Sequence, residues 1–262
     1  LALFYYIACC ICIWSMDLKI ASFNLHGLNN GGSMLENLCN DFDIICLQEH
    51  WLLPANLDTL AKYNSKFTGF AISGIVDIDH FAVHGGRPYG GVSVLWKSNS
   101  NFTCTILGVD DLHRCVAFKI ENDFSSFVCV NVYFPTFVNA DNYEEELLNC
   151  CGFIDSVYTQ QLDTCANFIV IGDFNFDVYR LESSDRLTVI RNLLEEYNMS
   201  VCDHLDVNHV GYTYRHEGLN TQSLIDHAFV TSDVVGLINQ YAVLDSGLNF
   251  SDHCAICISL SL

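Results

Sequence analysis

The chain has 262 residues, 51% of them hydrophobic, which is enough for one sizeable core. Its 11 basic and 31 acidic residues give a formal charge of −20, which disfavours a nonspecific grip on nucleic acid or on an anionic membrane. No linker, charge run or internal repeat divides the chain, so we predict a single domain over residues 16–262.

Residues 1–15 form an apolar run that is too short to span a membrane and lacks the basic flank of a signal peptide. We interpret them as a leader or an upstream translated segment outside the fold, with Met16 as the true start; a weak membrane anchor is the alternative. The 14 cysteines are scattered through predicted strands and helices as small core hydrophobes, and Cys254 and Cys257 should point to opposite faces of a terminal strand. These patterns disfavour a zinc site and favour a reducing, intracellular compartment.

The first half of the chain alternates short apolar runs with polar residues at their ends. The stretch Leu18–Asn24 predicts a first strand, and a helix is expected over Ser33–Cys39. Asp43–Leu47 is a second, buried strand that delivers Gln48 and Glu49 at its end. Residues 92–97 and three further stretches are typical of an antiparallel meander or sandwich layer: Phe102–Leu107, Arg114–Ile120 and Phe127–Phe134.

In the second half, Phe168–Ile171 predicts a buried strand that Gly172 ends. Asp173 and Asn175 then share one side of the chain while Phe174 packs behind them, because side chains alternate along an extended backbone. A carboxylate that can deprotonate a water, beside an amide that can donate to a phosphate oxygen, suits phosphate chemistry; an Asx-rich turn is the plainer alternative. The other elements expected here are helices over Asn142–Leu162 and Ser184–Tyr197 and strands over Tyr212–Arg215, Ser223–Val230, Tyr241–Leu244 and Cys254–Leu260.

This order of elements implies an α/β (α+β) fold, a four-layer αββα sandwich in which two mixed sheets pack face to face with helices outside. Polar residues fall at or near the predicted strand ends along the whole chain, and rigid scaffolds assemble active sites in this way. These residues are Asn24, Glu49, Tyr133, Asp173, Asn175, Asp226, Asp252 and His253.

Seven motifs follow one another in the order SFNLHG, ICLQEHW, GGVSVLW, VNVYFP, VIGDFNFD, LIDHAFV and SDHCAI. Together they resemble the endonuclease/exonuclease/phosphatase superfamily of DNase I-like folds, over about Leu18 to Leu260. LQEHWL, YGGVSVLW, GDFNFD and the terminal IDH and SDH are most similar to the apurinic-type endonuclease domain of LINE-class, non-LTR retrotransposons. The resemblance implies metal-assisted, in-line hydrolysis of a phosphodiester.

For the metal site, the resemblance implies Glu49 as the principal ligand of Mg2+, with Mn2+ as an alternative ion. Asn24 would lie nearby, and Asp252 matches a second metal or water ligand. Two positions depart from the family. His26 stands where apurinic endonucleases commonly carry a carboxylate, so one metal ligand is not matched. Thr136 replaces an asparagine of many relatives, which weakens one phosphate or water contact.

For the reaction, the resemblance implies that Asp173 positions or deprotonates the attacking water. Asn175 would hold the scissile phosphate, and Tyr133 matches a tyrosine that contacts it. His253 matches the catalytic histidine and Asp226 the carboxylate that orients it. Such a pair fixes the tautomer and favours an imidazolium that stabilises the transition state or acts as general acid or base.

The function implied is a DNA-nicking endonuclease of a retrotransposon. Its partner would be double-stranded DNA, cut on one strand, with no membrane association and with a monomeric isolated domain. It would act inside the cell, and in the nucleus when its substrate is the genome. One alternative is a phosphoesterase of the same fold that acts on inositol phosphate, phospholipid or RNA, which the charge of −20 favours. The other is a decayed, non-catalytic copy, which the presence of all the main site residues disfavours.

Several other residues adjoin the predicted site. His26, His50 and His227 are neighbours of site residues but should face away from them along an extended chain. Recognition of the substrate is expected from the loops Ile75–Tyr89 and Asp203–Gly211. Candidate phosphate contacts, most of which we expect to be ordinary surface charges, are Arg87, Lys97, Arg114, Arg180, Arg186, Arg191 and Arg215.

Overall fold

The computed structural model describes residues 17–75, 86–136, 142–165, 167–179 and 185–261. The segment interpreted as a leader, residues 1–15, and the predicted start at Met16 lie outside these ranges. Within them, no helix combines the length and the apolar character needed to cross a membrane.

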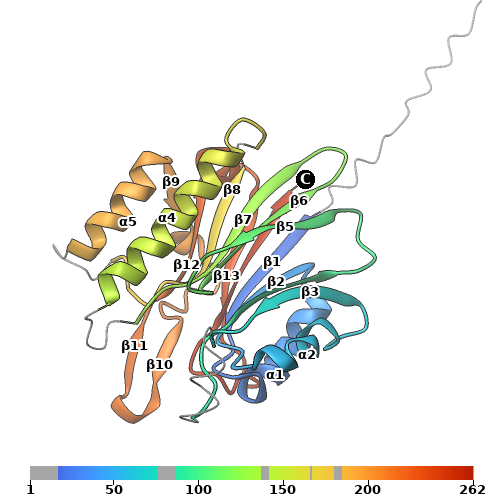
Figure 1. The fold of residues 1–262 in the computed structure, drawn as a ribbon, viewed down its shortest axis with the longest axis vertical. Helices are drawn as coiled ribbons and strands as arrows, with labels where there is room; N and C mark the ends of the chain where they lie inside the picture. Colours follow the sequence, from blue (N-terminus) through green and yellow to red (C-terminus); the bar gives the residue numbers. More distant parts are fainter. Residues whose placement is uncertain (1–16, 76–85, 137–141, 166, 180–184, 262) are drawn as a thin grey trace, which may run out of the picture.

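Two six-stranded sheets form the body of the protein (Figure 1). The first has the order β13 (Ile238–Leu244), β14 (Ala255–Ser261), β1 (Asp17–Asn24), β2 (Ile44–Gln48), β4 (Val92–Lys97) and β3 (Phe67–Ile72). The second has the order β5 (Thr103–Val109), β6 (Cys115–Glu121), β7 (Ser126–Tyr133), β8 (Phe168–Asp173), β12 (Asp226–Thr231) and β9 (Met199–Val201). Each sheet is mixed, because β1 and β2 are parallel, as are β7 and β8, whereas the other pairs are antiparallel.

Helices cover the outer faces of both sheets (Figure 1). On the first sheet lie α1 (Leu28–Asp41) and the short α2 (Asp58–Ala61); on the second lie α4 (Tyr143–Gln161) and α5 (Asp185–Glu196). A one-turn helix, α6 (Ser232–Val235), follows β12, and the strands β10 (Tyr214–His216) and β11 (Thr221–Ser223) form a separate hairpin that extends from one end of the sandwich.

Three apolar clusters hold these layers together. In the central one, side chains of the first sheet such as Ile20 meet side chains of the second such as Phe118. Leu35 of α1 belongs to a cluster on the outer face of the first sheet, and Ile154 of α4 to one on the outer face of the second. Burial of apolar surface is the dominant favourable term in folding, so these clusters fix the layer order. The predicted four-layer αββα sandwich is confirmed.

The structure corrects some of the expected elements. Residues 92–97 do not join the three strands that follow them; as β4 they pair with β2 and β3 in the first sheet. The strand expected over Ser223–Val230 is interrupted at Leu224 and Ile225, which separates β11 from β12. The helix expected over Ser33–Cys39 extends to Leu28–Asp41. Strand pairing joins segments that are distant in sequence, so spacing along the chain does not determine which sheet a strand enters.

A polar bridge crosses the central core just below the strand ends. Gln48 of β2 donates from Nε2 to Oδ1 of Asn131 on β7 (2.6 Å) and to Oγ of Ser22 (2.9 Å). Asn131 in turn donates from Nδ2 to the carbonyl oxygens of Leu47 (3.1 Å) and Ser93 (3.0 Å). These side chains are buried, where hydrogen bonds are directional and costly to lose. The bridge therefore holds the two sheets at a set distance beside the residues that end β2 and β7.

Candidate active site

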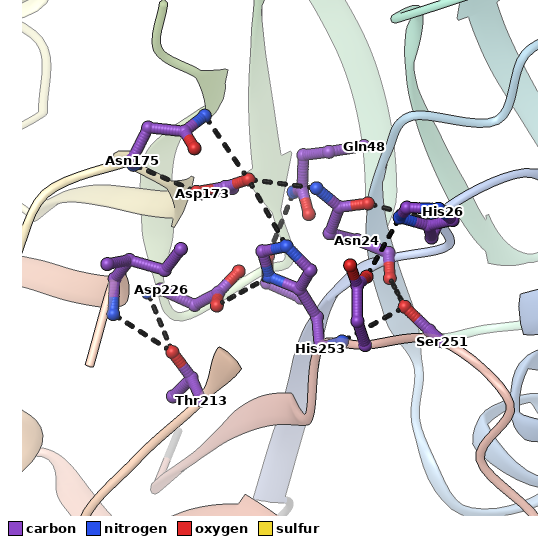
Figure 2. Close-up of polar contacts among 12 residues, drawn as sticks. Asn24, His26, Gln48, Asp173, Asn175, Thr213, Asp226, Ser251 and His253 are labelled. Atoms are coloured by element: carbon purple, nitrogen blue, oxygen red, sulfur yellow. Dashed lines mark hydrogen bonds and ion pairs between the residues drawn. The ribbon is translucent and has the colours of Figure 1, made fainter. Parts of the chain in front are cut away.

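Strand ends from both sheets meet at one end of the sandwich (Figure 2). The strands β1, β2, β7 and β8 end there, and the antiparallel strands β12 and β14 begin there. Asp226 and Tyr133 both lie opposite Asp173 in the strand register. Hydrogen bonds and electrostatic contacts link all eight residues that the sequence singled out: Asn24, Glu49, Tyr133, Asp173, Asn175, Asp226, Asp252 and His253.

The carboxylate of Glu49 is held from two sides. Nδ2 of Asn24 donates to Oε1 (3.1 Å), and the indole Nε1 of Trp51 donates to Oε2 (2.9 Å). Glu49 and Trp51 have positive φ values, 50° and 56°, which are uncommon for residues other than glycine. Sequence reasoning did not assign a role to Trp51, although the indole follows Glu49 by two residues in the motif ICLQEHW.

Asn24 is fully buried, and its amide has only one possible orientation. The backbone N–H of His26 donates to Oδ1 of Asn24 (2.9 Å), so the amide NH2 must face the other way. It donates to Glu49 and, at 2.8 Å, to Oδ2 of Asp173. Asn24 therefore orients two carboxylates that come from different sheets, while its side-chain oxygen, Oδ1, faces the turn after β1.

Asp173 ends β8 and is buried. The backbone N–H of Asn175 donates to its Oδ1 (2.9 Å), and the Asn175 amide donates to the carbonyl oxygen of Phe134 (2.8 Å) and more weakly to Oδ2 of Asp173 (3.4 Å). Phe174 packs behind them in the outer core, as predicted. Burial, followed by the charge of Asp226, raises the pKa of Asp173 to about 7 against the opposing effects of its other neighbours. Asp173 can thus exchange a proton near neutral pH.

His253 and Asp226 form a buried pair. Nδ1 of His253 lies 2.9 Å from Oδ2 of Asp226, and Nε2 lies 3.9 Å from Oδ2 of Asp173. Burial by itself lowers the pKa of His253, but the charges of Asp226 and Asp173 outweigh it and raise the pKa to about 10. The ring is therefore an imidazolium at neutral pH, with Nδ1–H donating to Asp226 and Nε2–H directed toward Asp173 (Figure 2).

Tyr133 lies next to Glu49 at the end of β7. Burial, followed by the charges of Glu49 and Asp173, raises the pKa of Tyr133 well above its usual range, so the hydroxyl stays protonated and donates to Glu49. The guanidinium of Arg114 lies 5.3 Å from the centroid of the Tyr133 ring and pairs with Glu146 at 2.7 Å. Among the candidate phosphate contacts, Arg114 is thus held beside the site.

The prediction that His26 faces away from the site is wrong. Its Nδ1 lies 2.9 Å from Oδ1 of Asp252, and its ring packs on that of Trp51 with the centroids 4.7 Å apart. The hydrogen bond to Asp252 raises the pKa of His26. Burial raises the pKa of Asp252, but His26 and His253 outweigh burial and lower it. The alternation of side chains ends with β1 at Asn24, and the backbone of His26 turns to a φ of 45°, which redirects the imidazole.

The other two neighbouring histidines do face away, as predicted. His50 is buried; its Nε2 lies 2.9 Å from the carbonyl oxygen of Ile72, and its Nδ1 accepts from the backbone N–H of Leu52 (3.0 Å). Burial lowers the pKa of His50 to about 4, so this ring is neutral. His227 contacts Oδ2 of Asp203 (2.7 Å) and the carbonyl oxygen of Phe176 (2.9 Å) on the far side of β12. Both imidazoles support the backbone around the site.

The structure describes only some of the expected recognition loops and candidate phosphate contacts. Most of the loop Ile75–Tyr89 lies outside the described residues, as do Arg180 and the side chain of Arg186. The guanidinium of Arg87 stacks 4.0 Å from the centroid of the Trp51 ring, close to Glu49. Lys97 pairs with Asp43 (2.8 Å) at the start of β2, the end of the strand opposite to the site.

The donor set of the site suits a hard divalent cation. Carboxylate oxygens of Asp173 and Asp226 lie within 4.8 Å of each other, and Glu49 and Asp252 add two carboxylates that are partly exposed. His253 lies in the same cluster but, as an imidazolium, has no free nitrogen lone pair for the ion. Oδ1 of Asp226 is buried and has no hydrogen-bond partner among the described residues, so it is an acceptor that a cation or a water would satisfy. Carboxylate oxygen is the ligand that Mg2+ and Mn2+ prefer.

The cysteines that the structure describes are free thiols, most of them buried. Cys254 belongs to the central core and Cys257 to the outer core of the first sheet, so their side chains point to opposite faces as predicted. A second buried group, Asp110, Cys115 and Cys150, lies apart from the site; its carboxylate accepts from the backbone N–H groups of Arg114 (2.7 Å) and Cys115 (2.6 Å) and so shapes the turn before β6.

Comparison with known proteins relates this geometry to one family. Residues 21–253 match the Endonuclease/Exonuclease/phosphatase family. A search of the curated proteins gave no match. Among solved structures, the chain is similar to an AP endonuclease from Leishmania major (16% identity, TM-score 0.73, 95% of this chain and 89% of the other). It is also similar to a 3′ phosphatase from Neisseria bound to a product DNA hairpin (18% identity, TM-score 0.65, 94% and 100%). The endonuclease domain of TRAS1, a telomere-specific non-LTR retrotransposon, shares the fold as well (15% identity, TM-score 0.66, 94% and 99%).

Proposed function

The chain belongs to the endonuclease/exonuclease/phosphatase family and is a phosphodiester hydrolase, and we propose that it is a Mg2+-dependent endonuclease that nicks one strand of double-stranded DNA. The observation that carries the proposal is the His253–Asp226 pair. In this pair an imidazolium points at Asp173, with Nε2 of His253 3.9 Å from Oδ2 of Asp173, and the carboxylate of Glu49 lies beside them. Metal-assisted hydrolysis of a phosphodiester needs a base, a cation beside the phosphate and a carboxylate that holds a metal ion, and these residues supply all three.

In this proposal Asp173 orients the attacking water and accepts its proton. The hydrogen bonds from Asn24 and from the backbone of Asn175 fix the direction of the carboxylate. A general base works best when its pKa is near the working pH, and burial of Asp173 raises its pKa to about 7. His253 stabilises the negative charge that develops on the phosphate, because Asp226 holds the ring in its charged form.

Asn175 and Tyr133 are proposed to contact the scissile phosphate. One amide hydrogen of Asn175 is held by the carbonyl oxygen of Phe134 (2.8 Å), whereas the contact with Asp173 is long at 3.4 Å. A phosphate oxygen can replace the longer contact with little cost. Tyr133 is the second proposed donor to the phosphate. Its protonated hydroxyl lies beside the carboxylates of Glu49 and Asp173.

Glu49, with Asp252, would hold the metal ion, which would act as a Lewis acid on the phosphate, whereas Asn24 directs its NH2 group at Glu49 and so orients this ligand instead of binding the ion. Two features of this chain's own residues support that assignment. Donors from Asn24, Trp51 and Tyr133 hold the Glu49 carboxylate in place at the site. Asp252 keeps its charge because its pKa is lowered by His26 and His253, although burial acts the other way.

The biological setting is also a proposal. The motifs LQEHWL, YGGVSVLW and GDFNFD resemble those of LINE-class retrotransposons, and the endonuclease domain of one such element shares the fold. We therefore infer that the domain nicks DNA as a monomer inside the cell, in the nucleus when the genome is the substrate.

The test is conversion of supercoiled plasmid to open circle by the full chain. We expect nicking that requires Mg2+, stops with EDTA and is lost in Glu49→Ala and His253→Ala. Glu195→Ala removes a carboxylate at an exposed position near the end of α5, away from the site, and should nick normally. Wild-type protein that is folded by circular dichroism but leaves the plasmid intact at low salt would overturn the DNA assignment.

A phosphoesterase with a non-DNA substrate is the second candidate, and the formal charge of −20 favours it because DNA is also strongly negative. Release of inorganic phosphate from soluble monoesters, or hydrolysis of RNA or phospholipid, without nicking of plasmid would favour this candidate over the first.

A further inference from the structure

A groove borders the candidate active site on the side of the β10–β11 hairpin. It encloses about 630 Å³ and is lined by His26, Tyr214, Arg215, His216, Asn249 and Phe250, among others. Asp252 lines it as well, so the groove opens directly onto the site. Nothing in the reaction proposed above uses its outer residues.

Phe250 is the unusual residue of this groove. Its side chain is 70% exposed, although it lies only three residues before His253. Isolated exposed hydrophobic residues are common, but an exposed phenyl ring at the mouth of a reaction site has a free face that a planar partner can cover. Because three residues span at most about 11 Å, that face is within reach of the nucleotides next to a phosphate at His253.

The segment that carries Phe250 is anchored on both sides. Oγ of Ser251 donates to the carbonyl oxygen of Asn24 (2.8 Å) and accepts from the backbone N–H of His253 (3.1 Å). The backbone N–H of Ser251 donates to Oδ1 of Asn249 (3.0 Å), and the Asn249 amide donates to the carbonyl oxygen of His253. The backbone at Phe250 is thus ordered before any ligand arrives, which lowers the entropic cost of binding.

Two lining residues that belong to β10, Tyr214 and Arg215, are also tied to the site. The backbone N–H of Arg215 donates to the carbonyl oxygen of Asp252 (2.8 Å), and the ring of Tyr214 packs on that of His253 with the centroids 5.0 Å apart. Arg215 is exposed and lines the groove. The groove thus combines an exposed aromatic ring with a cationic side chain, and this combination can bind a base by stacking and its phosphate by charge.

We propose that this flanking groove binds a nucleobase next to the scissile phosphate, with Phe250 stacked on the base and Arg215 on the adjoining phosphate. The inference rests on the proposed function, which it extends to substrate binding. Phe250 acts on affinity rather than on the reacting atoms, so its loss raises KM and leaves kcat unchanged.

The kinetic test compares nicking of one defined duplex by wild type, Phe250→Ala, Phe250→Trp and Phe124→Ala. Phe124 is 90% exposed in the turn before β7, at the end of that strand opposite to Tyr133, so it is a matched control. We expect Phe250→Ala to raise KM about tenfold with kcat within about twofold of wild type, and Phe250→Trp to retain the wild-type KM. Phe124→Ala should change neither constant.

A binding measurement without turnover provides an independent readout. A duplex with 2-aminopurine at the positions that flank the cut is titrated with protein in EDTA. Stacking on Phe250 should quench the 2-aminopurine fluorescence with wild type and Phe124→Ala, but not with Phe250→Ala. A small activated phosphodiester without a nucleobase should be hydrolysed equally by all four proteins, which shows that each variant is folded and active.

The outcomes separate the two proposals. If Phe250→Ala and wild type have the same KM and the same quenching, the nucleobase site is wrong while the endonuclease assignment stands. If wild type hydrolyses the small diester but neither binds nor nicks DNA, the proposed DNA substrate is wrong, and the nucleobase site fails with it.

Discussion

Glu49 shows how single residues set the geometry of the site. Two residues of its turn, Glu49 and Trp51, have a left-handed backbone conformation. The ring of Trp51 fits in this turn because Gly27 has no side chain. A Cβ atom on Gly27, which has a φ of +90°, would overlap the ring of Trp51. Strained backbone persists only where surrounding contacts determine it, and here the contacts hold the indole N–H on the Glu49 carboxylate. Trp51 therefore supports the residue that we assign to the metal.

Substitution Trp51→Phe tests this support because it removes the indole N–H and keeps an aromatic ring. We expect the Mg2+ concentration for half-maximal nicking to rise about tenfold, since partners of a metal ligand commonly contribute this much to metal affinity. Trp96→Phe, on β4, is the control for loss of an indole. Unchanged dependence on Mg2+ in Trp51→Phe, with an unchanged melting temperature, would show that the hydrogen bond has no such role.

His50 makes stability depend on pH. Burial lowers its folded-state pKa to about 4 from an ordinary value of 6.5, so the unfolded chain binds the proton first as pH falls. The stabilisation is complete above pH 6.5 and is lost as pH falls toward 4, by up to about 3 kcal/mol. Urea unfolding in EDTA at pH values between about 7 and about 4 measures this loss. His50→Gln cannot titrate and should lack this part of the slope; equal slopes for both proteins would contradict the assignment.

At the scale of elements, β8 brings Asp173 against β7 with very little space between the strands. Gly172 has a φ of +152°, and a Cβ atom there would overlap the carbonyl oxygen of Val132 on β7. The neighbouring backbone cannot yield as a flexible side chain could. Close pairing of β7 and β8 is therefore possible only with glycine at this position, and it brings Asp173 opposite Tyr133.

Two glycine substitutions separate this effect from ordinary chain entropy. Gly172→Ala should lower the free energy of unfolding by at least about 2 kcal/mol, because the methyl group meets backbone atoms. Gly152→Ala, on α4, meets nothing within 4 Å and should raise the free energy of unfolding by up to about 1 kcal/mol. Urea denaturation of both variants checks the prediction, and a Gly172→Ala protein as stable as wild type would refute it.

At the scale of the whole molecule, the charge distribution limits how DNA can be bound. The formal charge is −20, and the described cations closest to the site include Arg87, Arg114 and Arg215. Arg114 is already paired with Glu146. A surface of this kind gives little of the nonspecific attraction that basic nucleases obtain from many phosphate contacts.

Binding to DNA should therefore depend only weakly on salt. With about two phosphate contacts, the logarithm of the binding constant should fall with the logarithm of salt concentration with a slope of about −2. Fluorescence anisotropy of a labelled duplex in EDTA over a range of salt measures this slope. A slope of about −5 or steeper would mean that a larger cationic surface forms in the complex.

The sequence by itself determined the layer architecture and the eight polar residues of the site. Short apolar runs such as Phe168–Ile171 predict buried strands because a chain that is apolar on both faces must be covered on both. Polar residues at the ends of such runs, such as Asn24 and Asp173, must then lie at the edge of the core. Those two inferences need only local pattern, and the structure confirms both.

Only the tertiary structure decided which sheet each strand enters and which neighbours of the site face it. Residues 92–97 pair with β2, and His26 and Trp51 contact Asp252 and Glu49. Where the backbone is extended, successive side chains alternate between the two faces of the strand, so the sequence predicts which face a side chain occupies. The backbone at His26, Glu49 and Trp51 has positive φ values, and this rule does not apply there. At these turns, packing against distant strands sets the direction of each side chain, because no local pattern encodes it.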